Sequence, residues 1–422
     1  MTALEFLRGL PAAQNEGRRV GITSVCSAHP LVIEAALLEV SETGQVALIE
    51  ATCNQVNQDG GYTGMTPLDF RAYVAGIAGK VGFPADRIVF GGDHLGPNPW
   101  RKQSAEQAMA KALAMTRAYA AAGFAKIHLD ASMACADDPA VLAPAVIAER
   151  SARLAQAAED GAKGLEPPCY IIGTEVPVPG GAAEELGELV VSTPEDAAAT
   201  LALHQAAFGA LGLQGAYSRV LGLVVQPGVE FGHANVIGYV PEKAAGLVAF
   251  RQGKGVVFEA HSTDYQSGAA LKALVEGGFA ILKVGPGLTF ALREALYGLD
   301  QIAGLLTDYP AGSLPAAMEA VMLAGPGDWA AYYHGDDRQQ HSLRHFSYSD
   351  RIRYFWNRPE ALASVGRLEA ALAGVRIPET LISQYLPRLY PAVQDGLKPE
   401  ARVLTIAAVR AALAPYSAAC RG

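Results

Sequence analysis

The sequence predicts a (β/α)8 barrel of the α/β class that is followed by a helical C-terminal extension. Short apolar runs recur along the first 300 residues, and each is followed by a corner rich in Gly, Pro, Asn or Asp and then by an Ala- and Leu-rich stretch. The runs are continuous rather than alternating, which is typical of strands buried on both faces of a parallel sheet. The eight candidate strands are "RRVGITSV", "QVALIEAT", "RIVFGGD", "AKIHLDAS", "CYIIGTEVP", "VLGLVVQPG", "GVVFEAHS" and "FAILKVGP".

Eight β-then-α units over about 280 residues match this barrel in count and in length. A doubly wound open sheet is the main alternative, but that fold seldom contains eight evenly spaced units. We therefore expect residues 1–300 to form the barrel with the active site, and residues 301–422 to form the extension. Its stretches "SLPAAMEAVMLAG", "SYSDRIRYFW", "PEALASVGRLEAALAG" and "PETLISQYLPRLYPAV" read as helices that cover one end of the barrel or a neighbouring subunit. "SYSD" before an apolar run is also an ordinary helix N-cap signature.

Composition narrows the class of protein. Half of the 422 residues are hydrophobic, 18% are charged, and the formal net charge is −9. Such a chain is typical of a globular protein, and its negative charge argues against nucleic acid or an anionic membrane as a partner. The five cysteines are scattered and never form CxxC, the start lacks a signal peptide, and no uninterrupted apolar run approaches the ~20 residues of a spanning helix. We expect a reduced, cytoplasmic protein that forms a homo-oligomer.

Histidines stand at the predicted C-terminal ends of three strands, where barrel enzymes keep their chemistry. They are His94 in "GGDHLGPNPW", His233 in "VEFGHAN" and His261 in "FEAHSTDYQ". Three imidazoles that converge on one mouth can hold a divalent metal; nitrogen ligands favour Zn²⁺, with Mn²⁺, Co²⁺ or Mg²⁺ as alternatives. The competing interpretation is that they are ordinary hydrogen-bonded loop residues. The histidines that we expect to be structural are His29, His128 and His204.

Carboxylates accompany these histidines. Asp93 is next to His94 and suits a proton shuttle on a substrate hydroxyl, unless it only caps a helix or stabilises its loop. Glu175, after the fifth strand, is a second candidate for proton transfer, a metal ligand or a partner of a ligand. Glu259 shares a strand face with His261, or it points into the barrel core as a buried, paired acid.

The eighth strand ends in "KVGPGLT", where glycine N–H groups and a helix N-terminus can bind phosphate. The alternative is a simple tight turn between strand and helix. The phosphate candidates are Ser262, Thr263, Gly285, Gly287 and Thr289. Further candidates for substrate binding are Gln226, Asn235 and Lys283.

Long phrases of the chain resemble the GatZ/KbaZ-like family, the Z-type subunits of class II D-tagatose-1,6-bisphosphate aldolases. They are "GGDHLGPNPW", "IGTEVPVPGG", "VVQPGVEFGHAN", "FEAHSTDYQ", "ILKVGPGLTFALREAL" and "SDRIRYFW", and together they cover nearly the whole chain. The resemblance implies a barrel related to zinc-dependent class II aldolases. It also implies an acid/base role for Asp93 and metal-ligand roles for His94, His233 and His261.

The family implies two functions. Some members resemble 4-epimerases that interconvert D-tagatose 6-phosphate and D-fructose 6-phosphate in galactitol or tagatose catabolism, and others resemble a non-catalytic, chaperone-like subunit of a separate aldolase. Because C4 of a 2-ketose is not α to the carbonyl, its proton is not acidic, so we expect a retro-aldol/aldol route in which C3–C4 breaks and re-forms. A bound metal would stabilise the charge that develops on the ketone and C3 oxygens. The sequence has no ATP-phosphate motif for a kinase and no nicotinamide site for transient oxidation at C4.

Overall fold

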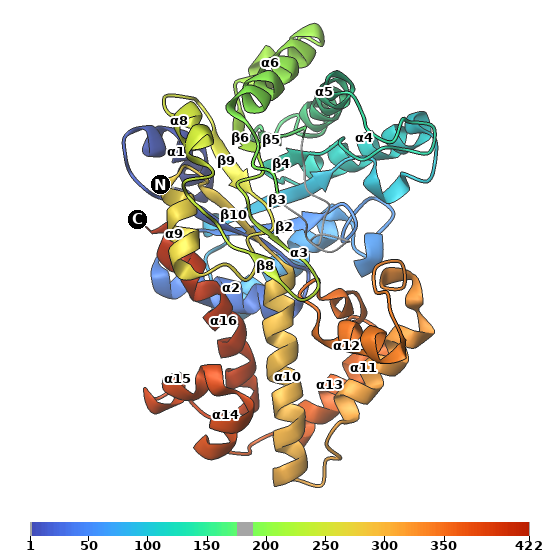
Figure 1. Cartoon of the computed structure of the whole chain (residues 1–422), viewed down its shortest axis with the longest axis vertical. Coiled ribbons are helices and arrows are strands. Elements are labelled where there is room, and N and C mark those ends of the chain that lie inside the picture. Colours follow the sequence, from blue (N-terminus) through green and yellow to red (C-terminus); the bar gives the residue numbers. More distant parts are fainter. Residues whose placement is uncertain (1, 175–188, 422) are drawn as a thin grey trace.

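A closed barrel of eight parallel strands stands at the centre of the described residues, which in this computed structural model are 2–174 and 189–421 (Figure 1). The strand order is β1-β10-β9-β6-β5-β4-β3-β2, and pairing of β1 with β10 closes the barrel. Each barrel strand lies on one of the predicted apolar runs, which confirms the fold class. The strands are β1 (Ile22–Cys26), β2 (Ala47–Thr52), β3 (Ile88–Leu95), β4 (Lys126–Leu129), β5 (Cys169–Ile172), β6 (Val220–Val224), β9 (Val257–Ala260) and β10 (Ile281–Val284).

Helices surround the barrel, and several begin at capping side chains. Thr66 and Asp69 form a capping box before α3, and Ser104, Thr193 and Ser267 cap α4, α6 and α9. The helices of this part are α1 (Ala3–Asn15), α2 (Pro30–Thr43), α3 (Pro67–Val81), α4 (Ala105–Ala121), α5 (Pro144–Gly161), α6 (Pro194–Ala210), α7 (Gln214–Tyr217), α8 (Ala245–Arg251), α9 (Gly268–Glu276) and α10 (Pro286–Leu306). Short 3-10 turns are η1 (Gly61–Thr63), η2 (Ala85–Arg87) and η3 (Asn98–Trp100).

The barrel interior changes from apolar to charged along the strands. At the N-terminal end, Ile22, Leu48 and Val89 form one buried cluster with Leu7 and Leu10 of α1, which closes this end. Since alternate residues of a strand share a face, the residues two positions further along also point inward. On several strands those residues are polar or charged, so the chemistry is confined to the C-terminal half of the barrel.

The extension leaves the barrel along α10, which Figure 1 shows running away from the strands with α16 beside it. Its helices are α11 (Ser313–Ala324), α12 (Asp337–Phe346), α13 (Pro359–Ala371), α14 (Glu379–Tyr385), α15 (Tyr390–Gln394) and α16 (Ala401–Cys420), with 3-10 turns η4 (Pro326–Asp328), η5 (Arg351–Phe355) and η6 (Pro387–Leu389). The last helix, α16, returns to pack against α2, α9 and β1. The division at residue 300 stays a prediction, because α10 runs through it.

Two details of the extension differ from the sequence-based expectation. "SYSD" does not cap an α-helix: Asp350 adopts a left-handed backbone with φ 45°, and a single 3-10 turn, η5, follows it. By length and composition, α16 is the one helix in the described part of the chain that would suffice to cross a membrane. Half of its apolar window is buried inside the molecule, as in the core helix of a globular protein.

Candidate active site at the C-terminal mouth

Two adjacent residues at the end of β3, Asp93 and His94, both reach the barrel mouth. In a regular strand, neighbouring side chains point to opposite faces. His94, however, has a left-handed backbone with φ 48°, which turns the chain so that its ring follows the Asp93 carboxylate inward. Such a conformation costs about 1–3 kcal/mol in a residue other than glycine and is typical of functional sites. This turn lets the Asp-His pair act at one place.

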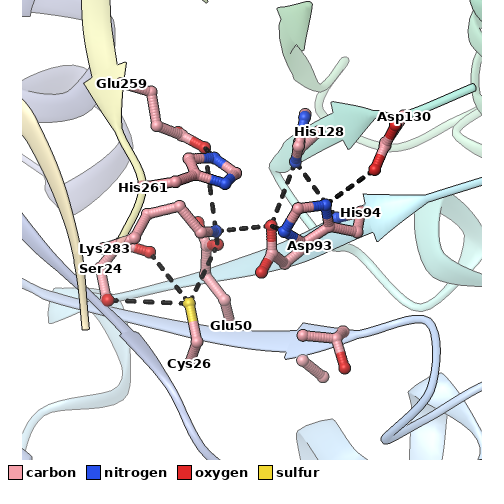
Figure 2. Close-up of polar contacts among 12 residues, drawn as sticks. Ser24, Cys26, Glu50, Asp93, His94, His128, Asp130, Glu259, His261 and Lys283 are labelled. Atoms are coloured by element: carbon pink, nitrogen blue, oxygen red, sulfur yellow. Dashed lines mark hydrogen bonds and ion pairs between the residues drawn. The ribbon is translucent and has the colours of Figure 1, made fainter. Parts of the chain in front are cut away.

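Three imidazoles meet beside this carboxylate: His94 from β3, His128 from β4 and His261 after β9 (Figure 2). The ring centroid of His94 lies 4.9 Å from those of His128 and His261, and the latter two are 5.2 Å apart. One nitrogen from each ring and a carboxylate oxygen of Asp93 lie within 4.8 Å of one another. All four residues are buried, so the donor atoms are shielded from bulk water.

Carboxylates orient two of these rings from behind. Asp130 Oδ2 is 2.8 Å from Nδ1 of His94, and Glu259 Oε1 is 2.9 Å from Nε2 of His261. In each ring, the opposite nitrogen has no hydrogen bond from a described residue. A carboxylate behind an imidazole fixes the tautomer and raises the basicity of the other nitrogen, as is common for metal-ligating histidines.

The third ring, His128, has two neighbours that compete for one nitrogen. Its Nδ1 lies 3.1 Å from Asp93 Oδ1 and 3.2 Å from the backbone N–H of His94. If Nδ1 donates to Asp93, the lone pair is on Nε2, which is buried and has no partner among the described residues. An orphaned nitrogen in a fully buried ring is costly unless a ligand satisfies it.

A buried network of charged side chains adjoins the histidines, and Figure 2 shows Glu50, Glu259 and Lys283 of this network. Lys126 contacts Glu50 at 2.6 Å and Glu259 at 2.7 Å, and Lys283 contacts Glu50 at 2.6 Å and Asp93 at 2.5 Å. Gly91 makes room for it, because a Cβ there would lie 2.6 Å from Glu50 Cγ. The sequence left open whether Glu259 faces the core, and the structure places it there, paired with Lys126.

The electrostatics of this network favour added positive charge. Burial opposes the charge on Lys283, but Asp93 and the other nearby acids outweigh it and raise the pKa of its ammonium well above the usual range. Burial also opposes ionisation of Asp93, yet His94 and Lys283 hold its pKa well below the usual range. With Asp130 included and the imidazoles neutral, as metal ligands must be, the network holds four carboxylates and two ammonium groups, a formal excess of two negative charges. The residues therefore fit a divalent cation in charge as well as in donor set.

His233 does not join this cluster, in contrast to the expectation from the sequence. Its Nδ1 lies 2.9 Å from Ser349 Oγ and its Nε2 3.1 Å from the carbonyl oxygen of Tyr332, so both nitrogens face the extension. The cause is the segment between β6 and β9, where a small hairpin of β7 (Glu230–Phe231) and β8 (Val236–Ile237) carries His233 at its turn. His128, which we had expected to be structural, takes the third place.

Most donors of the expected phosphate site are already engaged. Asp264 Oδ1 accepts the N–H groups of Gly285 at 2.9 Å and Gly287 at 2.7 Å, so a carboxylate of the chain itself occupies the N-terminus of α10. The hydroxyl of Thr263 donates to the carbonyl oxygen of Lys283, and that of Thr289 donates to Asp350. Ser262, with φ 53°, and Lys283 line the cavity of the site.

The remaining candidates lie elsewhere. Gln226 Oε1 accepts the N–H groups of Gly228 and Val229 and so shapes the loop after β6. Asn235 is exposed in the turn of the small hairpin, where its carbonyl oxygen accepts the N–H of Gly232. Glu175 lies outside the described residues.

The cavity at this mouth opens to solvent. Asp93, His94 and His261 line one part of it. Arg353 and Tyr354 of η5 line another, so the extension contributes directly to the site, as one interpretation of the sequence held. The Tyr354 ring packs edge-on against Tyr62 from the loop after β2, with centroids 5.1 Å apart, and both rings line the cavity.

Comparisons with known proteins agree with this architecture. A model of the family described as "D-tagatose-1,6-bisphosphate aldolase subunit GatZ/KbaZ-like" matches residues 7–421. The chain is 55% identical to the D-tagatose 6-phosphate 4-epimerase of Agrobacterium fabrum, with 99% of each chain covered. It is 50% identical to the D-tagatose-1,6-bisphosphate aldolase subunit GatZ of Klebsiella pneumoniae, with 98% of this chain and 99% of the relative covered. A crystal structure of a probable tagatose 6 phosphate kinase from Sinorhizobium meliloti superimposes with a TM-score of 0.88 at 56% identity, with 95% of this chain and 100% of the other covered.

Proposed function

This chain belongs to the GatZ/KbaZ-like family, and we propose from this premise that it is a metal-dependent ketohexose-phosphate 4-epimerase. It would interconvert D-tagatose 6-phosphate and D-fructose 6-phosphate by a retro-aldol/aldol route. The observation that carries the proposal is the buried cluster of Asp93, His94, His128 and His261, whose donor atoms converge in the mouth. The full-length likeness to a relative named as this epimerase supports it.

Asp93 would serve as the acid/base. Its pKa is held well below the usual range by His94 and Lys283 against the effect of burial, so the carboxylate is ionised at neutral pH. It would take the proton of the C4 hydroxyl, and the O–H electron pair would form the C4 carbonyl as the C3–C4 bond breaks. The electrons of that bond would move toward the C2 carbonyl. The aldehyde would then rotate so that its opposite face meets C3. The C3–C4 bond would form again, and Asp93 would return the proton to the C4 oxygen.

His94, His128 and His261 would hold the cation, each through one ring nitrogen. When bound, the cation would supply Lewis-acid stabilisation of negative charge on the substrate oxygens. We propose Zn²⁺, because imidazoles dominate the donor set, with Mn²⁺, Co²⁺ and Mg²⁺ to be compared.

Lys283 would keep Asp93 ionised and in place through its contact at 2.5 Å. Glu175 is proposed as a further ligand or proton-transfer group. The proposal also includes a cytoplasmic location and a homo-oligomer. All five cysteines are free, as in a reduced protein, which supports the location.

The second candidate function is that of a non-catalytic subunit of a class II D-tagatose-1,6-bisphosphate aldolase. The observation that favours it is the 50% identity, over nearly the whole chain, to a relative named as such a subunit. A partner of that kind would be the aldolase catalytic subunit, and the metal cluster would then be retained without turnover of its own.

One experiment separates the two functions. The purified chain is stripped of metal, reloaded with Zn²⁺, Mn²⁺, Co²⁺ or Mg²⁺, and incubated alone with D-fructose 6-phosphate while ³¹P and ¹³C NMR follow D-tagatose 6-phosphate. We expect the epimer to appear with at least one metal and not with the stripped chain. Absence of the epimer with every metal, together with activation of an added aldolase catalytic subunit, would establish the subunit function instead.

A further inference from the structure

Arg353 is a cation of the extension that lies at the catalytic cavity. It belongs to η5, which follows Asp350 with its left-handed backbone, and it lines the same cavity as Asp93, His94 and His261. The guanidinium is therefore placed by a segment far along the chain from the barrel strands. Neither the metal cluster nor the acid/base step described above uses it.

The charge of Arg353 has no ion-pair partner among the described residues. Its Nη1 donates to the backbone oxygens of Ser349 and Asp350, and its Nη2 donates to the Tyr354 hydroxyl at 2.7 Å. All these acceptors are neutral, and no carboxylate of the described chain lies within 4.0 Å of the guanidinium. By contrast, Nη2 of the buried Arg150 lies 2.7 Å from Asp138 Oδ1. The carboxylates of Asp350 and Asp264 act on this charge only from beyond ion-pair distance, so an anion in direct contact with the partly buried guanidinium would be stabilised.

The loop between β10 and α10, which lines the same cavity, explains why a substrate anion would go to Arg353. The N–H groups of Gly285 and Gly287, which commonly bind phosphate in barrels, are bonded to Asp264. A phosphoryl group placed there would meet the Asp264 carboxylate and be repelled. Asp264 is also buried, so it has little solvent to screen it. The N–H groups between β10 and α10 are thus unavailable to an anion, whereas the guanidinium of the extension is not paired with a carboxylate.

We propose that Arg353 and Tyr354 form the subsite that binds the phosphoryl group of the phosphorylated ketose. The inference rests on the proposed epimerase function and specifies how its substrate is held. The guanidinium fork would donate to phosphoryl oxygens, and the Tyr354 hydroxyl, which accepts from Nη2, still has its own proton to donate. The extension is then the element that distinguishes phosphorylated from free ketohexoses.

The test uses the full-length, metal-loaded chain with Arg353→Gln and Arg353→Lys. Arg358→Gln is the matched control, since it removes an exposed guanidinium from the same extension, outside the residues that line the cavity. Isothermal titration measures binding of inorganic phosphate and of D-fructose 6-phosphate, and NMR measures turnover of D-fructose 6-phosphate and of D-fructose.

We expect Arg353→Gln to lower kcat/KM for the phosphorylated sugar roughly 100-fold and to weaken phosphate binding by a similar factor, because a charge-assisted pair is lost. Turnover of D-fructose should not change. Arg353→Lys should lie between, with about a 10-fold loss, since it keeps the charge but not the fork. If Arg353→Gln does not fold by circular dichroism, the loss in Arg353→Lys decides.

Phosphate binding by both Arg353 variants at the level of Arg358→Gln would overturn the subsite, as would a wild type that binds neither phosphate probe. The binding measurements need no turnover. A chain that binds phosphate through Arg353 but does not epimerise would therefore refute the proposed function and leave the subsite standing.

Discussion

On the β3–β4–β9 side of the mouth, side chains leave regular strands and converge on one point, whereas on the β10 side a loop and the extension engage each other. The first side presents buried donors whose partners stand behind them, as Asp130 stands behind His94. On the second side, donors that commonly serve ligands are already bonded, as the Gly285 N–H is to Asp264. The comparison teaches that side chains at strand ends stay available to a ligand, whereas the N–H groups of a loop can be taken up by hydrogen bonds within the chain.

The largest effect that this comparison predicts belongs to Asp93. Asp93→Asn keeps the shape but removes the base, so turnover of D-fructose 6-phosphate should fall by about 1000-fold or more. Metal content, measured by plasma mass spectrometry, should stay at the wild-type level because the histidines remain. Asp59→Asn, an exposed carboxylate, serves as the control. Turnover within tenfold of wild type would exclude the acid/base role.

The charged network beside the histidines gives the next effect. Glu259→Gln leaves Lys126 with one carboxylate instead of two and removes the anion behind His261. Breaking a buried pair in this way should lower the free energy of unfolding in urea by about 3–5 kcal/mol. Glu166→Gln, which removes an exposed partner of Arg8, should change it by about 0.5 kcal/mol or less. A small loss in both variants would show that the network contributes little to stability.

Asp264→Ala probes the opposite side of the mouth. It leaves two buried N–H groups at the start of α10 without an acceptor, so the free energy of unfolding should fall by about 2–4 kcal/mol. Asp264→Asn retains a side-chain oxygen and should lose less than half of that. Equal stability of the two variants would show that the hydrogen bonds from Gly285 and Gly287 to Asp264 do not stabilise the start of α10.

The smallest effect concerns pH. Burial raises the pKa of Asp350 to about 6 in the folded chain, above its usual 3.8. Between these values the unfolded chain has the lower proton affinity at this group, so its contribution to stability decreases as pH rises from about 4 to about 6 and is constant above. Asp350→Asn, which tolerates the left-handed backbone, should abolish up to about 3 kcal/mol of this decrease in urea titrations at several pH values. Identical pH profiles of variant and wild type would contradict the shift.

The predictable parts of the fold and site are those governed by strand periodicity. Continuous apolar runs located every barrel strand, and position at a strand end brought Asp93, His94, His261 and Lys283 to one cavity. The signal for His128 was present too, because in "KIHL" it shares the inner face with Lys126, two residues earlier.

The unpredictable parts are set by contacts between distant segments. His233 was misplaced because the long segment after β6 folds into a hairpin that turns its ring to Ser349 and Tyr332 of the extension. The hydrogen bond from the Gly285 N–H to Asp264 joins two loops, and no local sequence pattern predicts that they meet. The left-handed Asp350 likewise replaced an expected helix cap, and this is what brings Arg353 to the cavity.

The identity of the third imidazole tests the central claim most directly. X-ray absorption at the zinc edge counts the imidazoles around the metal in the Zn²⁺-loaded wild type, in His128→Gln and in His233→Gln. We predict three imidazoles in the wild type and in His233→Gln, and two in His128→Gln. Loss of an imidazole in His233→Gln, with three retained in His128→Gln, would contradict the account.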